Sequence, residues 1–92
     1  MPVEVRIPTM LRASVGGAAT VEAEVGTVGQ IIDSLVARYP AIGGQVVTED
    51  GSLHKFVNLY VNDDDIRYLS KLDTKVGDGD TLSIIPAVAG GV

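Results

Sequence analysis

The residues with the clearest chemical potential end the chain, which closes on Ala89-Gly90-Gly91-Val92. Without Cβ atoms, paired glycines let the backbone adopt nearly any φ and ψ and approach catalytic groups closely. Such a segment can be threaded into a narrow active site of another enzyme, where a terminal carboxylate becomes the reacting group. The tail is therefore a candidate substrate. Glycines are also common in tails without a function, so the pair alone leaves that alternative open.

The stretch before the tail predicts a fixed point from which it projects. Gly77-Asp78-Gly79-Asp80 is a turn signal, and residues 81–85 follow with a strand-like pattern. Pro86 then supplies no N–H to a ladder and often ends a strand. We therefore expect one folded domain over residues 1–86 and a flexible tail over residues 87–92.

Composition restricts the classes of function. The chain has 92 residues, enough for one domain, and contains no cysteine, which excludes disulfides, thiolate metal sites and thiol catalysis. A formal net charge of -5 argues against a nucleic-acid partner and fits either simple solubility or a more basic protein partner. Neither a secretory signal nor an apolar run of about 20 residues is present, so we expect a cytoplasmic protein without a membrane partner.

Hydrophobic periodicity predicts a hairpin followed by a helix. Apolar and charged residues alternate over 3–7, and apolar residues alternate again over 19–25, with a flexible turn at Gly16-Gly17 between the two strands. Thr27 and Gln30 have the spacing of a capping box. Apolar residues then recur at steps of three and four, which predicts a helix over 27–39.

The second half of the chain reads as strands separated by loops. The polar connection before residue 56 contains a short helical turn at 42–47, with Gly43-Gly44 as a loop hinge. A strand over 56–61, a turn at 62–64 and a further short strand at 66–68 follow. We therefore predict an α+β fold of the β-grasp (ubiquitin-like) type, a mixed sheet of four to five strands with one main helix on one face. The first and last strands would run parallel in its middle.

Strand alternation also predicts which residues meet a partner. If Leu59 and Val61 point towards the helix, Phe56 and Tyr60 point to the opposite face of the sheet, and the same alternation places Ile85 outside. Exposed apolar patches mark partner surfaces. The alternative is that one of the two aromatic side chains is buried beneath the long connection over residues 41–55. The predicted partner surface comprises Phe56, Tyr60, Ile85 and Val88.

Other polar residues give weaker signals. His54 is the only histidine and is interpreted as a surface residue, because no second histidine or cysteine could complete a metal site. Asp63-Asp64-Asp65 lacks the spaced ligands of a calcium loop and is interpreted as a solvated turn. No nucleophile with a neighbouring base is apparent. We therefore expect no catalytic residue, no metal and no bound cofactor.

Four stretches of the sequence resemble a known family. The approach Leu72-x5-Asp78-Gly79-Asp80-x-Leu82-x-Ile84 and the exit Pro86-Ala87-Val88-Ala89-Gly90-Gly91 resemble the ubiquitin-like sulfur carriers of the MoaD and ThiS type. The segments 7–12 and 53–63 are similar to the branch of that family that serves cysteine synthesis, the CysO carriers. The likeness runs the length of the chain.

The resemblance implies a mechanism. An adenylating enzyme related to the ubiquitin-activating family would use ATP to transfer AMP to the carboxylate of Gly91, and sulfide or a persulfide would displace AMP to leave a thiocarboxylate. The sulfur would then pass to an acceptor enzyme, with Ala89, Gly90 and Gly91 threaded into each active site. The carrier itself would be no enzyme. Cysteine, molybdopterin, thiazole and thiolated natural products are all possible destinations of the sulfur.

Val92 departs from the family pattern, in which the second glycine is the last residue. Its β-branched side chain stands where unencumbered backbone is wanted. Either a protease trims Val92 from a precursor, or the residue is not part of the natural end of the protein. Two other functions remain possible: a ubiquitin-like modifier joined to lysines, and a plain interaction domain whose tail does nothing.

Overall fold

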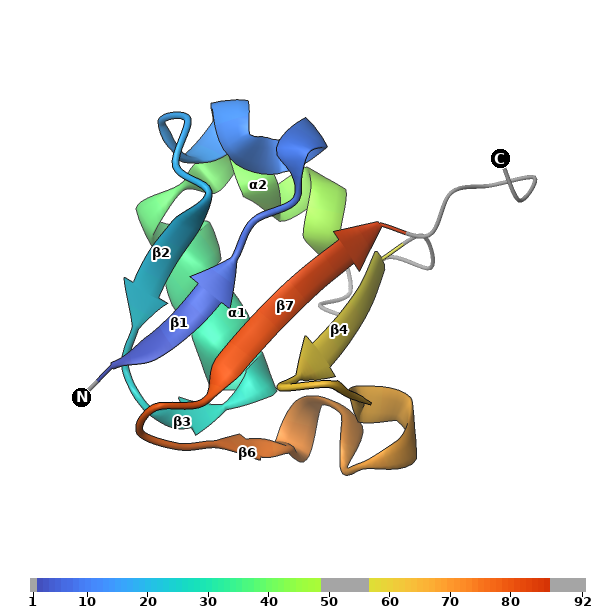
Figure 1. Ribbon diagram of the computed structural model, residues 1–92. Coiled ribbons are helices and arrows are strands. Elements are labelled where there is room, and N and C mark those ends of the chain that lie inside the picture. Colours follow the sequence, from blue (N-terminus) through green and yellow to red (C-terminus); the bar gives the residue numbers. More distant parts are fainter. Residues whose placement is uncertain (1, 49–56, 87–92) are drawn as a thin grey trace.

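The computed structural model describes residues 2–48 and 57–86, which contain a five-stranded mixed sheet with the order β2-β1-β7-β4-β5 (Figure 1). A second, two-stranded sheet pairs β3 with β6. The strands are β1 (Val3–Arg6), β2 (Thr20–Ala23), β3 (Gly26–Thr27), β4 (Val57–Val61), β5 (Asp64–Asp65), β6 (Lys75–Val76) and β7 (Thr81–Pro86).

The first and last strands are parallel neighbours in the centre of the sheet. Val5 of β1 lies opposite Leu82 of β7, and β2 and β4 flank this pair with antiparallel partners. A parallel pair needs a long crossover connection, which the helices supply. The predicted mixed sheet and its central parallel pair are confirmed, whereas the small β3–β6 sheet was not predicted.

Helix α1 (Val28–Arg38) lies across one face of the sheet, with its start fixed by a capping box (Figure 1). The Thr27 hydroxyl accepts a hydrogen bond from the Gln30 backbone N–H at 3.2 Å, and the Gln30 side chain accepts one from the Thr27 N–H at 2.9 Å. The predicted capping box is confirmed. The apolar stripe of α1 is buried at Val28, Ile31, Ile32 and Leu35.

Helix α2 (Pro40–Val46) confirms the predicted helical turn, but the loop hinge at Gly43-Gly44 is wrong. Both glycines lie inside α2, and Gly43 is buried against α1. A Cβ atom at Gly43 would stand 3.1 Å from Cγ1 of Val36, tighter than ordinary packing. Gly43 therefore allows the two helices to approach closely, a requirement that a glycine pair in the sequence does not distinguish from a flexible hinge.

Two strand predictions are corrected by the structure. The strand predicted over 19–25 is too long, because β2 ends at Ala23 and Val25 is exposed as the chain turns to pair with β6. The stretch Ile66–Tyr68 is a 3₁₀ helix, not a strand. The carboxylate of Asp65 accepts a hydrogen bond from the Arg67 N–H at 2.9 Å and so caps this helix. Further 3₁₀ helices span Thr9–Val15 and Lys71–Asp73.

The core lies between the sheet and the two α-helices. Leu59 and Val61 of β4 and Leu82 and Ile84 of β7 are buried, which confirms the predicted inward face of both strands. None of the helices in the described ranges is long and apolar enough to cross a membrane.

Candidate functional site

The end of β7 is the last described point before the tail, and it lies beside the start of β4. Pro86 pairs with Val57 across the two strands. Phe56, Val88 and the tail residues Ala89, Gly90, Gly91 and Val92 lie outside the described residues. Their predicted roles, and the predicted boundary between domain and tail, therefore stay predictions.

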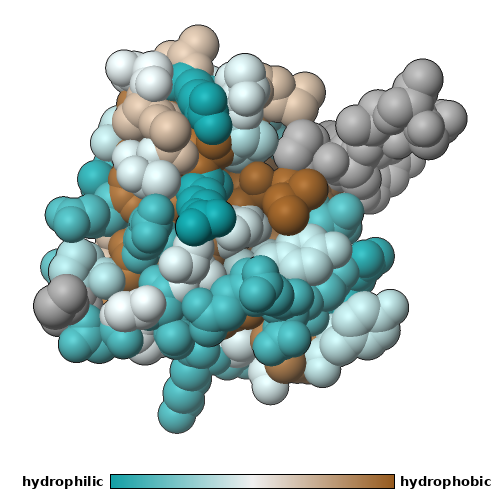
Figure 2. Space-filling model, viewed as in Figure 1, coloured by the Kyte–Doolittle hydropathy of each residue, from teal (hydrophilic) through white to brown (hydrophobic). Residues whose placement is uncertain are grey.

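The two described members of the predicted partner surface point away from the core. Tyr60 alternates with the buried Leu59 and Val61, and it is half-buried, while Ile85 is 44% exposed. Asn58 pairs with Ile85, and Tyr60 pairs with Ser83, so both lie on the face opposite α1. Figure 2 shows this face as largely hydrophilic, with a hydrophobic patch where β7 ends. The predicted register of β4 is confirmed over Val57–Val61.

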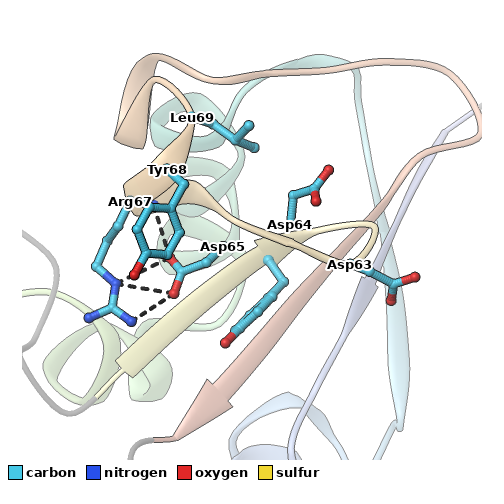
Figure 3. Close-up of a pocket in the computed structure, with 7 residues that line it drawn as sticks. Asp63, Asp64, Asp65, Arg67, Tyr68 and Leu69 are labelled. Atoms are coloured by element: carbon cyan, nitrogen blue, oxygen red, sulfur yellow. Dashed lines mark hydrogen bonds and ion pairs between the residues drawn. The ribbon is translucent and has the colours of Figure 1, made fainter.

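The sequence predicted a solvated turn at Asp63-Asp64-Asp65, and this prediction is only partly correct. Asp63 and Asp64 are exposed, but Asp65 is buried and forms an ion pair with Arg67. The Arg67 Nη2 donates to Oδ2 of Asp65 at 2.7 Å, and Nε donates to both carboxylate oxygens at 3.1 and 3.2 Å (Figure 3). The hydrogen bonds from the Arg67 side chain, and then from its backbone N–H, lower the pKa of Asp65.

This ion pair predicts a pH dependence of stability. Since the pKa of Asp65 is lower in the folded than in the unfolded chain, where it is about 4, the unfolded state binds more protons as the solution is acidified. The stabilisation is therefore complete above pH 4 and is lost as pH falls through the folded pKa. We expect Asp65→Asn to lower the melting temperature at pH 7, with the difference from wild type shrinking below pH 4. Asp64→Asn is the control, and an equal effect of both substitutions would contradict this assignment.

Within the described residues, no group of three or more histidine, cysteine, aspartate or glutamate side chains could hold a metal ion. Sequence reasoning missed Tyr68 and Leu69, which are exposed beside the Asp65–Arg67 pair. Tyr68 had been assigned to a short strand. The available signal was an aromatic residue and a leucine directly after a polar turn.

Comparison with known proteins identifies the family. The chain matches the ThiS family over residues 5–91. It belongs to that family. The match extends to Gly91 and leaves Val92 outside, in agreement with the departure seen in the sequence.

Relatives within and near the family are small ubiquitin-like proteins. The sulfur carrier protein CysO of Mycobacterium tuberculosis is 46% identical over 93 residues, covering 99% of this chain and 100% of that protein. Small archaeal modifier protein 3 of Haloferax volcanii is 38% identical over 65 residues, covering 71% of this chain and 70% of the modifier.

A solved structure confirms the fold. The crystal structure of the BexX/CysO complex of Amycolatopsis orientalis contains a chain that is 50% identical, with a TM-score of 0.87, covering 97% of this chain and 99% of that one. The predicted β-grasp fold and the resemblance to the CysO carriers are both confirmed. As a member of this family, the chain is a small ubiquitin-like protein of the carrier type rather than a catalyst.

Proposed function

We propose that this protein is a sulfur carrier whose reacting group is the carboxylate of Gly91, exposed after Val92 is removed. The carboxylate attacks the α-phosphorus of ATP on an activating enzyme, and pyrophosphate leaves. Sulfide then attacks the acyl carbon and displaces AMP. The product is a thiocarboxylate, which donates its sulfur to a cysteine precursor or to a thiolated natural product.

The observation that carries this proposal is the similarity to the CysO sulfur carrier of M. tuberculosis over 99% of the chain. The fold supports it, because β7 is hydrogen-bonded between β1 and β4 and so holds the base of the tail in a rigid sheet. Activation takes place on the partner's catalytic groups, so the carrier needs no nucleophile or metal of its own. ATP is accordingly a substrate of the activating enzyme.

The proposed partners are an adenylating enzyme of the ubiquitin-activating type, a sulfur-acceptor enzyme and a protease that trims Val92. The crystal structure of a BexX/CysO complex supports the idea that such a carrier docks on a partner protein. Because adenylation consumes cellular ATP, we expect these encounters to take place in the cytoplasm.

The second candidate function is a protein modifier, favoured by the 38% identity to small archaeal modifier protein 3. Both functions begin with the same acyl adenylate, but a modifier passes its acyl group to the amine of a lysine. Incubation with the activating enzyme, ATP and sulfide, followed by intact-protein mass spectrometry, separates them. A carrier gains about 16 mass units, the difference between oxygen and sulfur at the carboxylate. Conjugates of higher mass without this species would favour the modifier.

Tyr60 is expected to contribute to docking on the activating or acceptor enzyme. It lies on the outer face of β4, and truncating an aromatic hot spot costs about 2 kcal/mol or more, roughly a thirtyfold loss of affinity. Tyr60→Ala should weaken binding in titration calorimetry while the melting temperature changes little. Tyr60→Phe keeps the ring and should bind nearly as wild type does. Unchanged affinity of the alanine variant would remove Tyr60 from the docking surface.

A further inference from the structure

An open hollow of about 560 Å³ lies at the edge of the sheet, where the turn from β4 to β5 meets the 3₁₀ helix Ile66–Tyr68 (Figure 3). Its walls combine three features. They are an exposed aromatic ring, an exposed leucine and a carboxylate that has no partner among the described residues. We refer to it as the edge hollow.

The electrostatic balance of the edge hollow is negative. Arg67 supplies the positive charge among its described lining residues, and this charge is taken up by Asp65. The carboxylate of Asp64 is exposed and makes no hydrogen bond or ion pair with the described part of the chain. Figure 3 shows Asp64 apart from the Asp65–Arg67 pair, while the carboxylate of Asp63 points away from the hollow. Asp64 is therefore available to a cation from outside.

The same hollow exposes apolar surface. Tyr68 is 84% exposed and Leu69 is 44% exposed, although both follow the buried Ile66. Tyrosine is enriched at protein interfaces, where its ring supplies contact area and its hydroxyl keeps a polar partner. An arginine or lysine side chain matches this mixture, because its methylene stem packs on apolar surface while its charged head stays polar. The ring of Tyr68 can also attract the cation directly.

The position of the edge hollow relates it to the tail. Tyr60, which lines the hollow, pairs with Ser83, three residues before Pro86 on β7. At the rise of a strand, this places Tyr60, the wall of the hollow nearest the tail, roughly 10 Å along the sheet from the point where the tail begins. A partner that holds the tail can therefore touch the hollow at the same time. Two separated contacts fix the orientation of a domain, which a tail held alone does not.

We propose that the edge hollow receives an arginine or lysine side chain of the activating enzyme, with its charged head at Asp64 and its stem on Tyr68 and Leu69. This contact orients the domain while the tail enters the active site. The choice of the activating enzyme rests on the proposed function. The negative net charge of -5 favours association with a partner surface of positive charge.

The test compares Asp64→Lys with a matched control, Asp33→Lys, in titrations of the full chain against the activating enzyme. Asp33 is exposed on α1, across the sheet from the outer face, so both substitutions change the net charge equally. We expect Asp64→Lys to weaken binding by about tenfold or more, because it places like charges together, and Asp33→Lys to change it by less than about twofold. Tyr68→Ala, an exposed truncation, should also weaken binding without lowering the melting temperature.

The outcomes separate this inference from the proposed function. Equal effects of the two lysine substitutions, no effect of either, or failure of the wild-type chain to bind would each overturn docking at the edge hollow. Thiocarboxylate formation on the wild-type chain is measured in parallel by intact-protein mass spectrometry. If every variant forms the thiocarboxylate at the wild-type rate at limiting enzyme and binds with unchanged affinity, the carrier function stands and the docking contact alone is refuted.

Discussion

Replacing Leu35 by alanine is expected to lower the free energy of unfolding by about 2 to 5 kcal/mol. Leu35 is 1% exposed and packs where α1, α2 and β7 meet, beside Ile42 and Ile84. Shortening this side chain removes apolar contacts and leaves a cavity that rigid neighbours fill only in part. Urea denaturation followed by circular dichroism measures the change.

The matched control for Leu35 is its neighbour Ser34, which is exposed on the same helix. Ser34→Ala should leave the denaturation midpoint almost unchanged, because alanine is a good helix former and no buried contact is lost. A midpoint for Leu35→Ala that equals wild type would place Leu35 on the surface and contradict the helix packing.

The second large effect concerns the last residue. The chain ending at Gly91 should be charged with sulfur about a hundredfold faster than the chain ending at Val92, since small misplacements of a reacting group cost rates of that order. In the longer form the carboxylate stands one residue further along, and the valine side chain crowds it. Both rates are measured in single-turnover reactions with the activating enzyme, ATP and sulfide. The reactions are stopped at intervals, and the products are analysed by intact-protein mass spectrometry.

A Val92→Gly chain separates the two causes of that effect. It keeps the extra length and removes the side chain, so slow charging of this form assigns the effect to the position of the carboxylate. Rapid charging assigns it to the branched side chain. Equal rates for the forms ending at Gly91 and Val92 would show that trimming is not required.

The elements that were predicted correctly are those whose structure depends on residues close together in the sequence. The capping box at Thr27 and Gln30, the buried stripe of α1 and the alternation of β4 and β7 all depend on contacts a few residues apart or on one consistent face. The parallel pairing of β1 with β7 followed from the order of the elements, because a single crossover helix leaves few ways to bury every apolar face.

Features that depend on distant partners were missed. Gly43 resembles a hinge in the sequence, yet its role is set by Val36 on a different helix. Asp65 resembles its acidic neighbours until Arg67 folds back onto it and buries it. The small β3–β6 sheet joins residues about fifty positions apart, and neither strand is long enough to show an alternating pattern.

The candidate site was predictable in its chemistry and only partly in its surface. The outward position of Tyr60 and Ile85 was predicted from the alternation of their strands. The exposure of Tyr68 and Leu69 was not predicted, because it depends on a 3₁₀ helix where the sequence pattern indicated a strand. The roles of Gly91 and Val92 came from the resemblance to the family, and they lie beyond the described residues.

The most direct test of the account locates the sulfur. The chain ending at Gly91 is incubated with the activating enzyme, ATP and sulfide, and the product is fragmented in the mass spectrometer. The account predicts a gain of about 16 mass units, carried only by fragments that contain the carboxylate of Gly91. An unchanged mass, or a gain carried by fragments from residues 2–86, would contradict the claim that this protein carries sulfur at its C-terminal glycine.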